Sequence, residues 1–364
     1  EGVELLYKYI LRYAAKHPEI DILAFWLADG INNWCECKEC RKISPSDRYV
    51  QIVNELSERL YAVNPQMKLE AIAYANTMIP PKKEKIRNKY GNVIFMYAPI
   101  AHCYNHSLFD PDCVTRKKFT GWPVMNKLSQ PRNKKYASFI KKWFKDFRGE
   151  TYLFEYHLWP CAFANLIRPN LAEIYDKEPK SFPKYNIQGI VSCQTPRCFW
   201  PFGLNMTVLS EISFDGRKNW REIEKQYLGD YFGTVALQLS KSFTETREFL
   251  IPFFSSYSHR KLGALHWKRI SEFLHSERKT LGQIPLDSLS PVIKKQVKTY
   301  LAYLDIVKGR ALMEALLLEK DWRRLKKTVE DLQKIVNRAV KGDDEIVDDG
   351  DLKNPLAFFS SQLP

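Results

Sequence analysis

The sequence predicts an α/β protein: the C-terminal five βα units of a (β/α)8 TIM barrel, followed by an all-α domain. Apolar runs of strand length alternate with amphipathic helical segments through the first two hundred residues. This alternation is typical of a parallel sheet whose strands are joined by helical crossovers. Beyond about residue 202 only helical patterns remain. No Gly-rich phosphate loop follows any of the apolar runs, which disfavours the doubly wound nucleotide-binding folds.

The predicted elements follow one another at regular spacing. A stripe of apolar residues at helical spacing predicts a first helix over residues 1–15. Strands are predicted at residues 22–29, 68–76, 92–100, 150–160 and 187–196. Between them we expect a helix at 44–65, a loop and helix at 80–91, a long loop at 101–132, a helix at 133–149 and a crossover at 169–186.

This pattern predicts three regions: a partial barrel at residues 1–203, a helical domain at 204–341 and an acidic tail at 342–364. Because five strands do not complete an eight-stranded barrel, we expect the natural protein to extend upstream of residue 1. If a signal peptide lies in that upstream part, a periplasmic or secreted location is expected.

Charge and hydrophobicity along the chain indicate which classes of partner to expect. The chain has 56 Lys and Arg against 42 Asp and Glu, a net charge of +14, and such an excess favours anionic partners. The basic residues are spread over ordinary amphipathic segments and no nucleic-acid-binding motif occurs, so a nucleic-acid partner is not expected. No apolar run reaches eighteen residues, so no membrane span is predicted.

Several segments resemble one family. They are "WLADGINNWCECKEC" (26–40), "YNHSLFDPDC" (104–113), "TYLFEYH" (151–157) and "EISFDGRKNWREIEKQYLGDYFG" (211–233). Together they resemble uncharacterised bacterial TIM-barrel proteins grouped with glycoside hydrolases, distant relatives of α-glucuronidases and β-hexosaminidases. The resemblance covers roughly residues 5–240, and Phe214 and Gly216 stand where the family pattern has Trp and Pro. It implies the barrel fold strongly and the chemistry weakly.

Two carboxyl groups are candidates for glycoside hydrolysis, which requires a proton donor and a base or nucleophile on either side of the scissile bond. Asp29 ends the first predicted strand, and Glu155 lies within the apolar run of the fourth. The alternatives are an Asp that caps its own loop and a Glu paired with a basic residue at the barrel rim.

Further polar and aromatic residues fall at or beyond the predicted strand ends, where barrel enzymes build their active sites. Aromatic faces suit the C–H faces of sugar rings, and polar groups suit their hydroxyls. The predicted substrate-binding residues are Trp34, Tyr74, Asn76, Tyr97, His102, His106, Tyr156, His157, Gln194 and Arg197. Arg197 would suit an acidic or sulfated sugar. For each residue taken singly, core packing or an ordinary surface position is the alternative.

Three cysteines, Cys35, Cys37 and Cys40, follow the first predicted strand closely. With a fourth ligand from Cys103, Cys113, His102 or His106 they would form a closed structural zinc site. A disulfide to the loop of Cys103 and Cys113, or free thiols, remain alternatives. We expect that catalysis requires no cofactor. The predicted function is therefore a glycoside hydrolase-like protein of carbohydrate metabolism that acts on poly- or oligosaccharides, including anionic ones. The alternative is a carbohydrate-binding barrel without catalysis.

Overall fold

The computed structural model describes residues 2–26, 34–100, 102–113, 133–158, 171–193, 202–254, 262–342, 356–357 and 359–363. These residues divide into two compact units. The first comprises residues 1–156 and 180–193, and the second comprises residues 157–179 and 194–364. Among the described helices, none is both long and apolar enough to cross a membrane.

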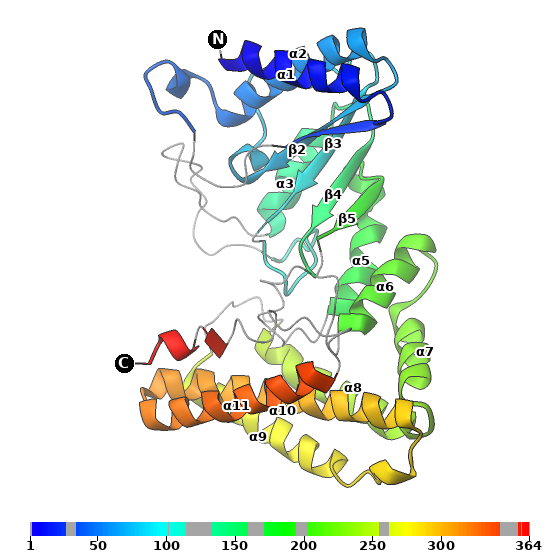
Figure 1. Cartoon of the computed structure of the whole chain (residues 1–364), viewed down its shortest axis with the longest axis vertical. Coiled ribbons are helices and arrows are strands. Elements are labelled where there is room, and N and C mark those ends of the chain that lie inside the picture. Colours follow the sequence, from blue (N-terminus) through cyan, green and yellow to red (C-terminus); the bar gives the residue numbers. More distant parts are fainter. Residues whose placement is uncertain are drawn as a thin grey trace. The chain divides into compact units, whose positions relative to one another are not determined.

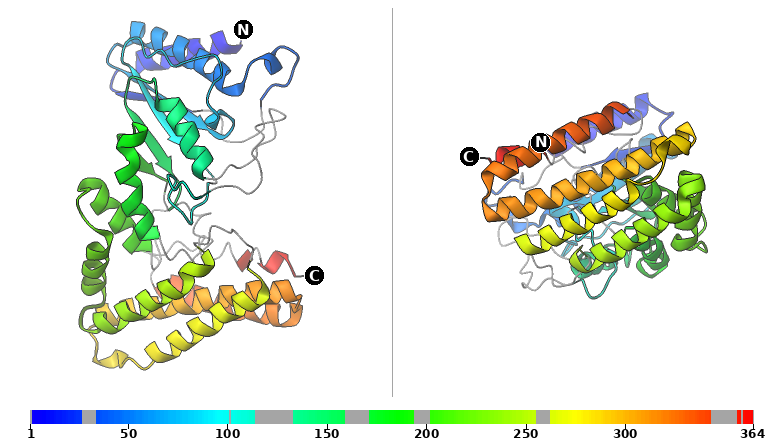
Figure 2. Two further views of the ribbon diagram at one scale, coloured as in Figure 1. Left: turned by 180° about the vertical axis from the view of Figure 1, so that it is seen from behind. Right: turned by 90° about the horizontal axis from the view of Figure 1, so that it is seen from below.

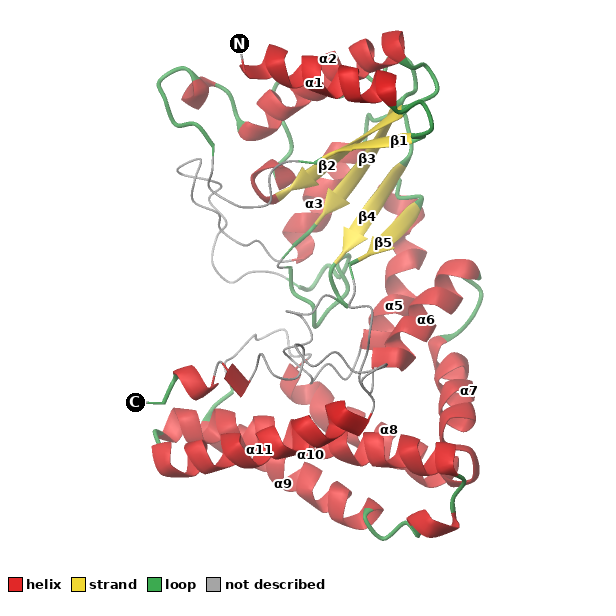
Figure 3. Ribbon diagram, in the orientation of Figure 1, coloured by secondary structure: helices red, strands yellow, loops and turns green. Residues whose placement is uncertain are grey.

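The first unit is a mixed α/β structure with a parallel sheet of five strands in the order β1-β2-β3-β4-β5 (Figure 3). The strands are β1 (Ile22–Phe25), β2 (Lys68–Tyr74), β3 (Val93–Ala98), β4 (Thr151–Glu155) and β5 (Gly189–Ser192). The helices of this unit are α1 (Gly2–Lys16), α2 (Pro45–Val63) and α3 (Asn133–Phe144), with short 3-10 turns η1 (Cys40–Lys42), η2 (Ala75–Met78) and η3 (Phe182–Tyr185). The α/β class and the five parallel strands predicted from the sequence are confirmed.

One face of the sheet is covered by helices, and Figure 2 (left) shows α3 in front of the strands when the molecule is seen from behind. The core of this face joins alternate residues of β2 and β3 to apolar residues of α2 and α3. Tyr49 of α2 ties two strands together, because its hydroxyl donates to Phe25 O of β1 (2.9 Å) and accepts from Ile72 N of β2 (2.8 Å). Tyr49 therefore links α2 to both β1 and β2.

The opposite face of the sheet, here called the concave face, carries an aromatic pair. Trp26, just after β1, and Phe154 of β4 meet edge to face, with ring centroids 5.5 Å apart. A flat sheet would hold β1 and β4 about 14 Å apart, because two strands lie between them and neighbouring strands are spaced about 4.8 Å. The two side chains span most of this gap by leaning toward each other, and curvature of the sheet toward the face that carries them supplies the rest.

The segment at residues 80–91 differs from its predicted loop and helix, because it contains no helix. The buried side chain of Asp47, in the first turn of α2, accepts the backbone N–H groups of Lys82, Lys83 and Glu84 at 2.8–3.0 Å. Asn54, two turns later, bonds both Lys85 O and Arg87 N. Since these side chains take up the backbone groups that a helix would pair internally, the segment stays extended across α2.

The second unit is helical in its described part (Figure 1). Its helices are α5 (Leu171–Ser181, which the unit boundary cuts after Pro179), α6 (Phe202–Phe214), α7 (Trp220–Phe232), α8 (Ala236–Phe254), α9 (Ala264–Leu281), α10 (Pro291–Glu319) and α11 (Trp322–Gly342), with turns η4 (Gly233–Val235) and η5 (Leu286–Ser288). The long helix α10 packs against α9 and α11. Arg247 of α8 pairs with Glu224 of α7 and stacks over the Trp220 ring, 4.9 Å from its centroid.

Candidate functional site

The carboxyl end of the sheet brings together two of the predicted site residues, His102 and Glu155. Glu155 is the last residue of β4, and His102 lies in the loop that follows β3. His102 Nε2 lies 2.9 Å from Glu155 Oε1, and the two side chains are 0% and 1% exposed. Tyr156 N donates to the same carboxylate oxygen at 2.7 Å. Glu155 is thus held from two sides by neighbouring polar groups.

The faces of β4 decide where Glu155 points. Thr151, Leu153 and Glu155 are buried, while Tyr152 and Phe154 are only half-buried, as the period of two in the sequence predicts. Leu153 belongs to the core beneath α2 and α3. Glu155 therefore leaves the strand on the helix-covered side, beneath the loop that carries His102, and the concave face belongs to its aromatic neighbours.

One residue at the start of α3, Asn133, fixes the loop that carries His102. Its Oδ1 accepts Cys103 N at 2.8 Å, and its Nδ2 donates to the carbonyls of Cys103, His106 and Ser107 at 2.8–3.0 Å. Asn133 is fully buried. Because its amide satisfies four backbone groups of a buried loop, it positions that loop, and His102 with it, against β4.

Next to His102 lies a compact group of sulfur and nitrogen atoms from Cys103, His106 and Cys113. One ligand atom of each residue lies within 4.8 Å of those of the other two, and all three residues are buried. Cys103 Sγ is 3.2 Å from His106 Nδ1. Hydrogen bonding with Cys113 holds the pKa of the Cys103 thiol well below its usual value, against the effect of burial and with a further contribution from His106.

The concave face carries two residues that the sequence interpretation did not single out, Trp26 and Glu70. Trp26 is 47% exposed, and its Nε1 donates to Glu70 Oε2 at 2.5 Å. Glu70 lies on β2 opposite Ala24 of β1. The sequence does carry a signal for Glu70, because it is an acid between apolar residues in the predicted strand "KLEAIAY". A half-exposed indole beside a carboxylate is suited to contact a polar ring from solvent.

The end of β2 lies at the same edge of the sheet. Ala75, directly after the strand, has φ 49°, in the left-handed region that costs a non-glycine residue about 1 kcal/mol or more. Such strain is found preferentially at functional sites. Asn76 is buried and Tyr74 is half-buried. Burial raises the pKa of Tyr156, and nearby Tyr74 and Cys193 add to the rise, which places these groups in one neighbourhood.

The remaining predicted residues lie in or against the helix-covered core, in the second unit, or outside the described residues. Tyr97 is fully buried, and its hydroxyl donates to Met78 O at 3.2 Å in the helix-covered core. Trp34 packs half-buried against that core. His157 is buried in the second unit, where its Nε2 lies 3.9 Å from Glu178 Oε1. Asp29, Gln194 and Arg197 lie outside the described residues.

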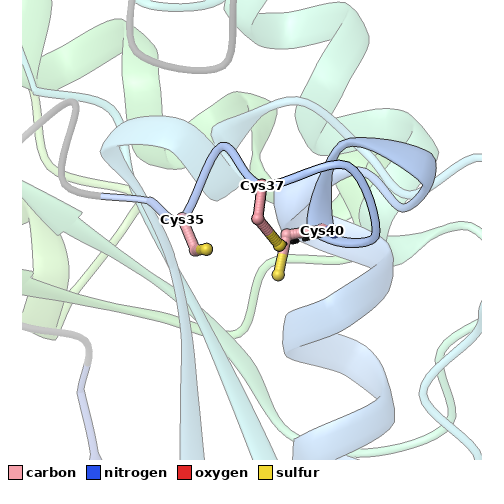
Figure 4. A group of neighbouring side chains, drawn as sticks. All are labelled: Cys35, Cys37 and Cys40. Carbon is pink, nitrogen blue, oxygen red and sulfur yellow. Dashed lines mark hydrogen bonds between the residues drawn. The ribbon is translucent and has the colours of Figure 1, made fainter.

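Cys35, Cys37 and Cys40 cluster in an exposed loop, with their sulfur atoms within 4.8 Å of one another (Figure 4). Cys40 N lies 3.5 Å from Cys37 Sγ and donates to it. This hydrogen bond lowers the pKa of Cys37 to about 7, and its side-chain partners Cys40 and Cys35 add to the effect. The same sharing raises the pKa of Cys40 to about 11. The loop therefore brings three sulfur atoms together, and the lowered pKa of Cys37 favours its thiolate form. Thiolate sulfur is a common zinc ligand.

Comparison with known proteins identifies the family of this chain. No curated protein matches the chain. Residues 2–245 match the family described as "Domain of unknown function (DUF4838)". Because the match covers more than half of the 364 residues and includes the whole sheet, the chain belongs to this family of domains of unknown function.

Proposed function

We propose that this protein is a glycoside hydrolase-like protein that acts on poly- or oligosaccharides, anionic ones included, by acid/base chemistry between two carboxyl groups. The observation that carries the proposal is the Glu155–His102 pair at the carboxyl end of a parallel sheet. That end is where parallel α/β enzymes place their catalytic groups. In the proposed mechanism, Glu155 is one carboxyl and His102 orients it, while Asp29, at the end of the first predicted strand, supplies the other.

The barrel interpretation is part of this proposal. The strands follow one another in sequence order without a reversal, whereas a doubly wound sheet reverses its order at a switch point. The contact between Trp26 and Phe154 fits a sheet that curves toward the face that carries them. Both features are those of a barrel segment, so we place the five strands as the C-terminal part of a (β/α)8 barrel whose interior is the concave face.

The concave face has the chemistry of a sugar-binding surface. Trp26 is half-exposed, and Phe154 packs edge to face with both Trp26 and Tyr156, the latter at 5.1 Å between ring centroids. Glu70 adds a carboxylate beside the indole. Aromatic faces bounded by hydrogen-bonding groups are the usual surface for pyranose rings, so a carbohydrate is the ligand class that this face suits best.

The preference for anionic sugars draws support from the helical unit. A groove of about 910 Å³ lies between α9, α10 and α11. Its charged lining is five basic residues and one acid: Arg278, Lys294, Lys295, Lys298, Arg338 and Asp305. Asp305 pairs with Arg278 at 2.9 Å, so the groove keeps a surplus of positive charge. A polyanionic chain would neutralise it.

We also propose that Cys35, Cys37 and Cys40 hold a structural zinc ion. Three sulfur atoms lie in one small loop, and Cys37 already receives a backbone N–H bond that favours the thiolate. Among the described residues no fourth His, Cys, Asp or Glu joins this group. A water molecule or a residue outside the described ranges would complete the tetrahedron. In this role the ion holds the loop that follows Asp29.

A second function is favoured by one observation. The Glu155 side chain is only 1% exposed and faces the helix-covered side, whereas a catalytic carboxyl must touch its substrate. If Glu155 and His102 serve only to hold the loop, the protein is a carbohydrate-binding barrel without hydrolytic activity. Glu70, on the concave face, would then contact the sugar.

The test is hydrolysis of a panel of glycans and aryl glycosides, neutral, uronic and sulfated, by the full chain and by Asp29→Asn, Glu155→Gln and Glu70→Gln. Glu150→Gln is the matched control, because this exposed glutamate lies at the other end of β4 and pairs with Lys68. We expect one substrate class to be cleaved, with a loss of about a hundredfold or more in Asp29→Asn and Glu155→Gln and no change in the control.

Binding of the same panel on a glycan array separates the two functions. Binding without cleavage, reduced by Glu70→Gln and unaffected by Glu155→Gln, would establish the non-catalytic barrel instead. Neither cleavage nor binding of any glycan would refute both.

A further inference from the structure

The group formed by Cys103, His106 and Cys113 has no part in the proposed function, and it is a different kind of site from the exposed cysteine loop. All three residues come from one segment of eleven residues in the loop after β3, at spacings Cys-x-x-His and His-x6-Cys. They are 6%, 5% and 0% exposed. Their ligand atoms lie within 4.8 Å of one another, and Cys103 Sγ and His106 Nδ1 approach to 3.2 Å.

We propose that Cys103, His106 and Cys113 form a second metal site, which binds a zinc ion through two sulfur atoms and the imidazole Nδ1. Two thiolates and one imidazole are a common donor set for zinc. In a tetrahedral site with metal–ligand distances of about 2.0–2.3 Å, the donors lie less than about 4 Å apart, so only small side-chain movements are needed. No fourth His, Cys, Asp or Glu of the described residues lies within reach of all three. A water molecule takes the fourth position.

Two features of the surroundings favour a metal over a disulfide between Cys103 and Cys113. No disulfide joins Cys103 to Cys113 in this structure, and the His106 imidazole lies against Cys103 Sγ as a third donor of the kind that zinc binds. The loop backbone is also fixed from outside the group, because Asn133 bonds Cys103 N, Cys103 O and His106 O. Lys134 N donates to Cys113 O at 3.2 Å. Outer bonds of this kind orient the ligands of metal sites.

The position of the group defines its role. Cys103 directly follows His102, whose Nε2 meets Glu155. A bound ion would lock the loop from Cys103 to Cys113, which has no helix or strand of its own. His102 would then be held against the end of β4. The ion is thus structural, and it is distinct from any ion in the exposed cysteine loop, which follows β1.

The experiment uses the full chain in which Cys35, Cys37 and Cys40 are replaced by serine, so that the exposed loop cannot contribute sulfur ligands. The zinc content of this variant is measured by mass spectrometry after dialysis. The expected result is about one ion per chain, and X-ray absorption at the zinc edge should show two sulfur and one or more nitrogen ligands. Cobalt(II) in place of zinc should give the intense visible bands of a tetrahedral site with sulfur-to-metal charge transfer in the near ultraviolet.

In the same background, Cys103→Ser/Cys113→Ser should lose the ion and both spectral signatures, whereas Cys193→Ser should keep them. His106→Gln retains both sulfur atoms, and it should weaken zinc binding at least about tenfold; this variant serves if the double variant does not fold. Absence of zinc from the background variant would overturn the proposal. A Cys103–Cys113 disulfide in a non-reducing digest would also overturn it. So would full zinc retention in both His106→Gln and Cys103→Ser/Cys113→Ser. None of these readouts depends on hydrolysis, so the result stands whether or not the glycosidase proposal fails.

Discussion

The two cysteine groups of the first unit offer the most informative comparison in the molecule. Cys35, Cys37 and Cys40 lie within a span of six residues of an exposed loop, and they meet one another through local turns. Cys103, His106 and Cys113 are buried, and the side chain of Asn133 from α3 holds their loop in place. The first group is made by sequence proximity, and the second depends on the packed fold. Perturbing the second should therefore disturb the whole unit, while perturbing the first should remain local.

The largest difference should appear in global stability. Cys103→Ser/Cys113→Ser should lower the free energy of unfolding by on the order of 4 kcal/mol, because it removes a metal site and leaves polar groups buried. Cys35→Ser/Cys37→Ser/Cys40→Ser also removes a proposed metal site, but it should cost less than about 1 kcal/mol, because the ion there holds only an exposed loop. Urea unfolding followed by tryptophan fluorescence measures both. Equal losses in the two variants would contradict the comparison.

The anchoring of the buried loop can be broken without touching its ligands. Asn133→Ala removes four hydrogen bonds to buried backbone groups, and we expect a loss of about 3 kcal/mol. Asn337→Ala is the control, because this exposed residue accepts a hydrogen bond from Gln333 on the same helix, and its change should lie within about 0.5 kcal/mol of zero. Thermal unfolding measures the pair. If Asn133→Ala unfolds like the control, the loop is held by something other than Asn133.

Asp47 is another buried residue that holds a loop, and its contribution to stability should depend on pH. Burial acts to raise the pKa of Asp47, but the hydrogen bonds from Ser44 and from the backbone N–H groups of Glu84, Lys83 and Lys82 outweigh it, so the pKa lies below the ordinary 3.8. A depressed pKa in the folded state contributes stability above the unfolded value, and this contribution is lost as the pH falls through the folded value. Asp47→Asn should therefore cost about 2 kcal/mol near neutral pH and progressively less below pH 3.8.

Unfolding of the wild type and Asp47→Asn between pH 2.5 and about 7 measures this dependence. The exposed Asp287, whose pKa is lowered by Lys294, provides the matched control. Asp287→Asn should change stability by less than about 0.5 kcal/mol at any pH, because exposed ion pairs contribute little. A difference between wild type and Asp47→Asn that does not shrink in acid would show that the loss comes from packing and not from the charge.

The smallest expected effect concerns reactivity. In metal-free protein, Cys37 should be alkylated by iodoacetamide with a rate that rises around pH 7, following its lowered pKa. Cys40, whose pKa is raised to about 11, should react at least roughly tenfold more slowly near neutral pH. Cys103 and Cys113 should be protected by burial in spite of the lowered pKa of Cys103. Peptide mapping after timed alkylation checks all four. Labelling of Cys103 as fast as Cys37 would show that the loop opens readily.

The sequence by itself determined the features that depend on neighbours along the chain. Continuous apolar runs predicted the parallel strands, because a strand covered on both faces has no polar side. The alternation in "TYLFE" puts Leu153 and Glu155 on the same face of β4, and in the structure that face is buried. The spacing of Cys35, Cys37 and Cys40 predicted that they cluster, since six residues of loop cannot separate them far.

Only the tertiary structure decided which distant residues meet. His102 and Glu155 are 53 residues apart, and their contact depends on the pairing of β3 with β4. Trp26 and Glu70 meet because β1 and β2 are neighbours and the sheet curls toward them. Residues 80–91 carry a local pattern compatible with a helix, but Asp47 and Asn54 capture their backbone groups from another element. Local patterns in the sequence indicate which residues are buried and whether a segment is a helix or a strand. The partners of a side chain from distant segments depend on tertiary packing, which no single segment specifies.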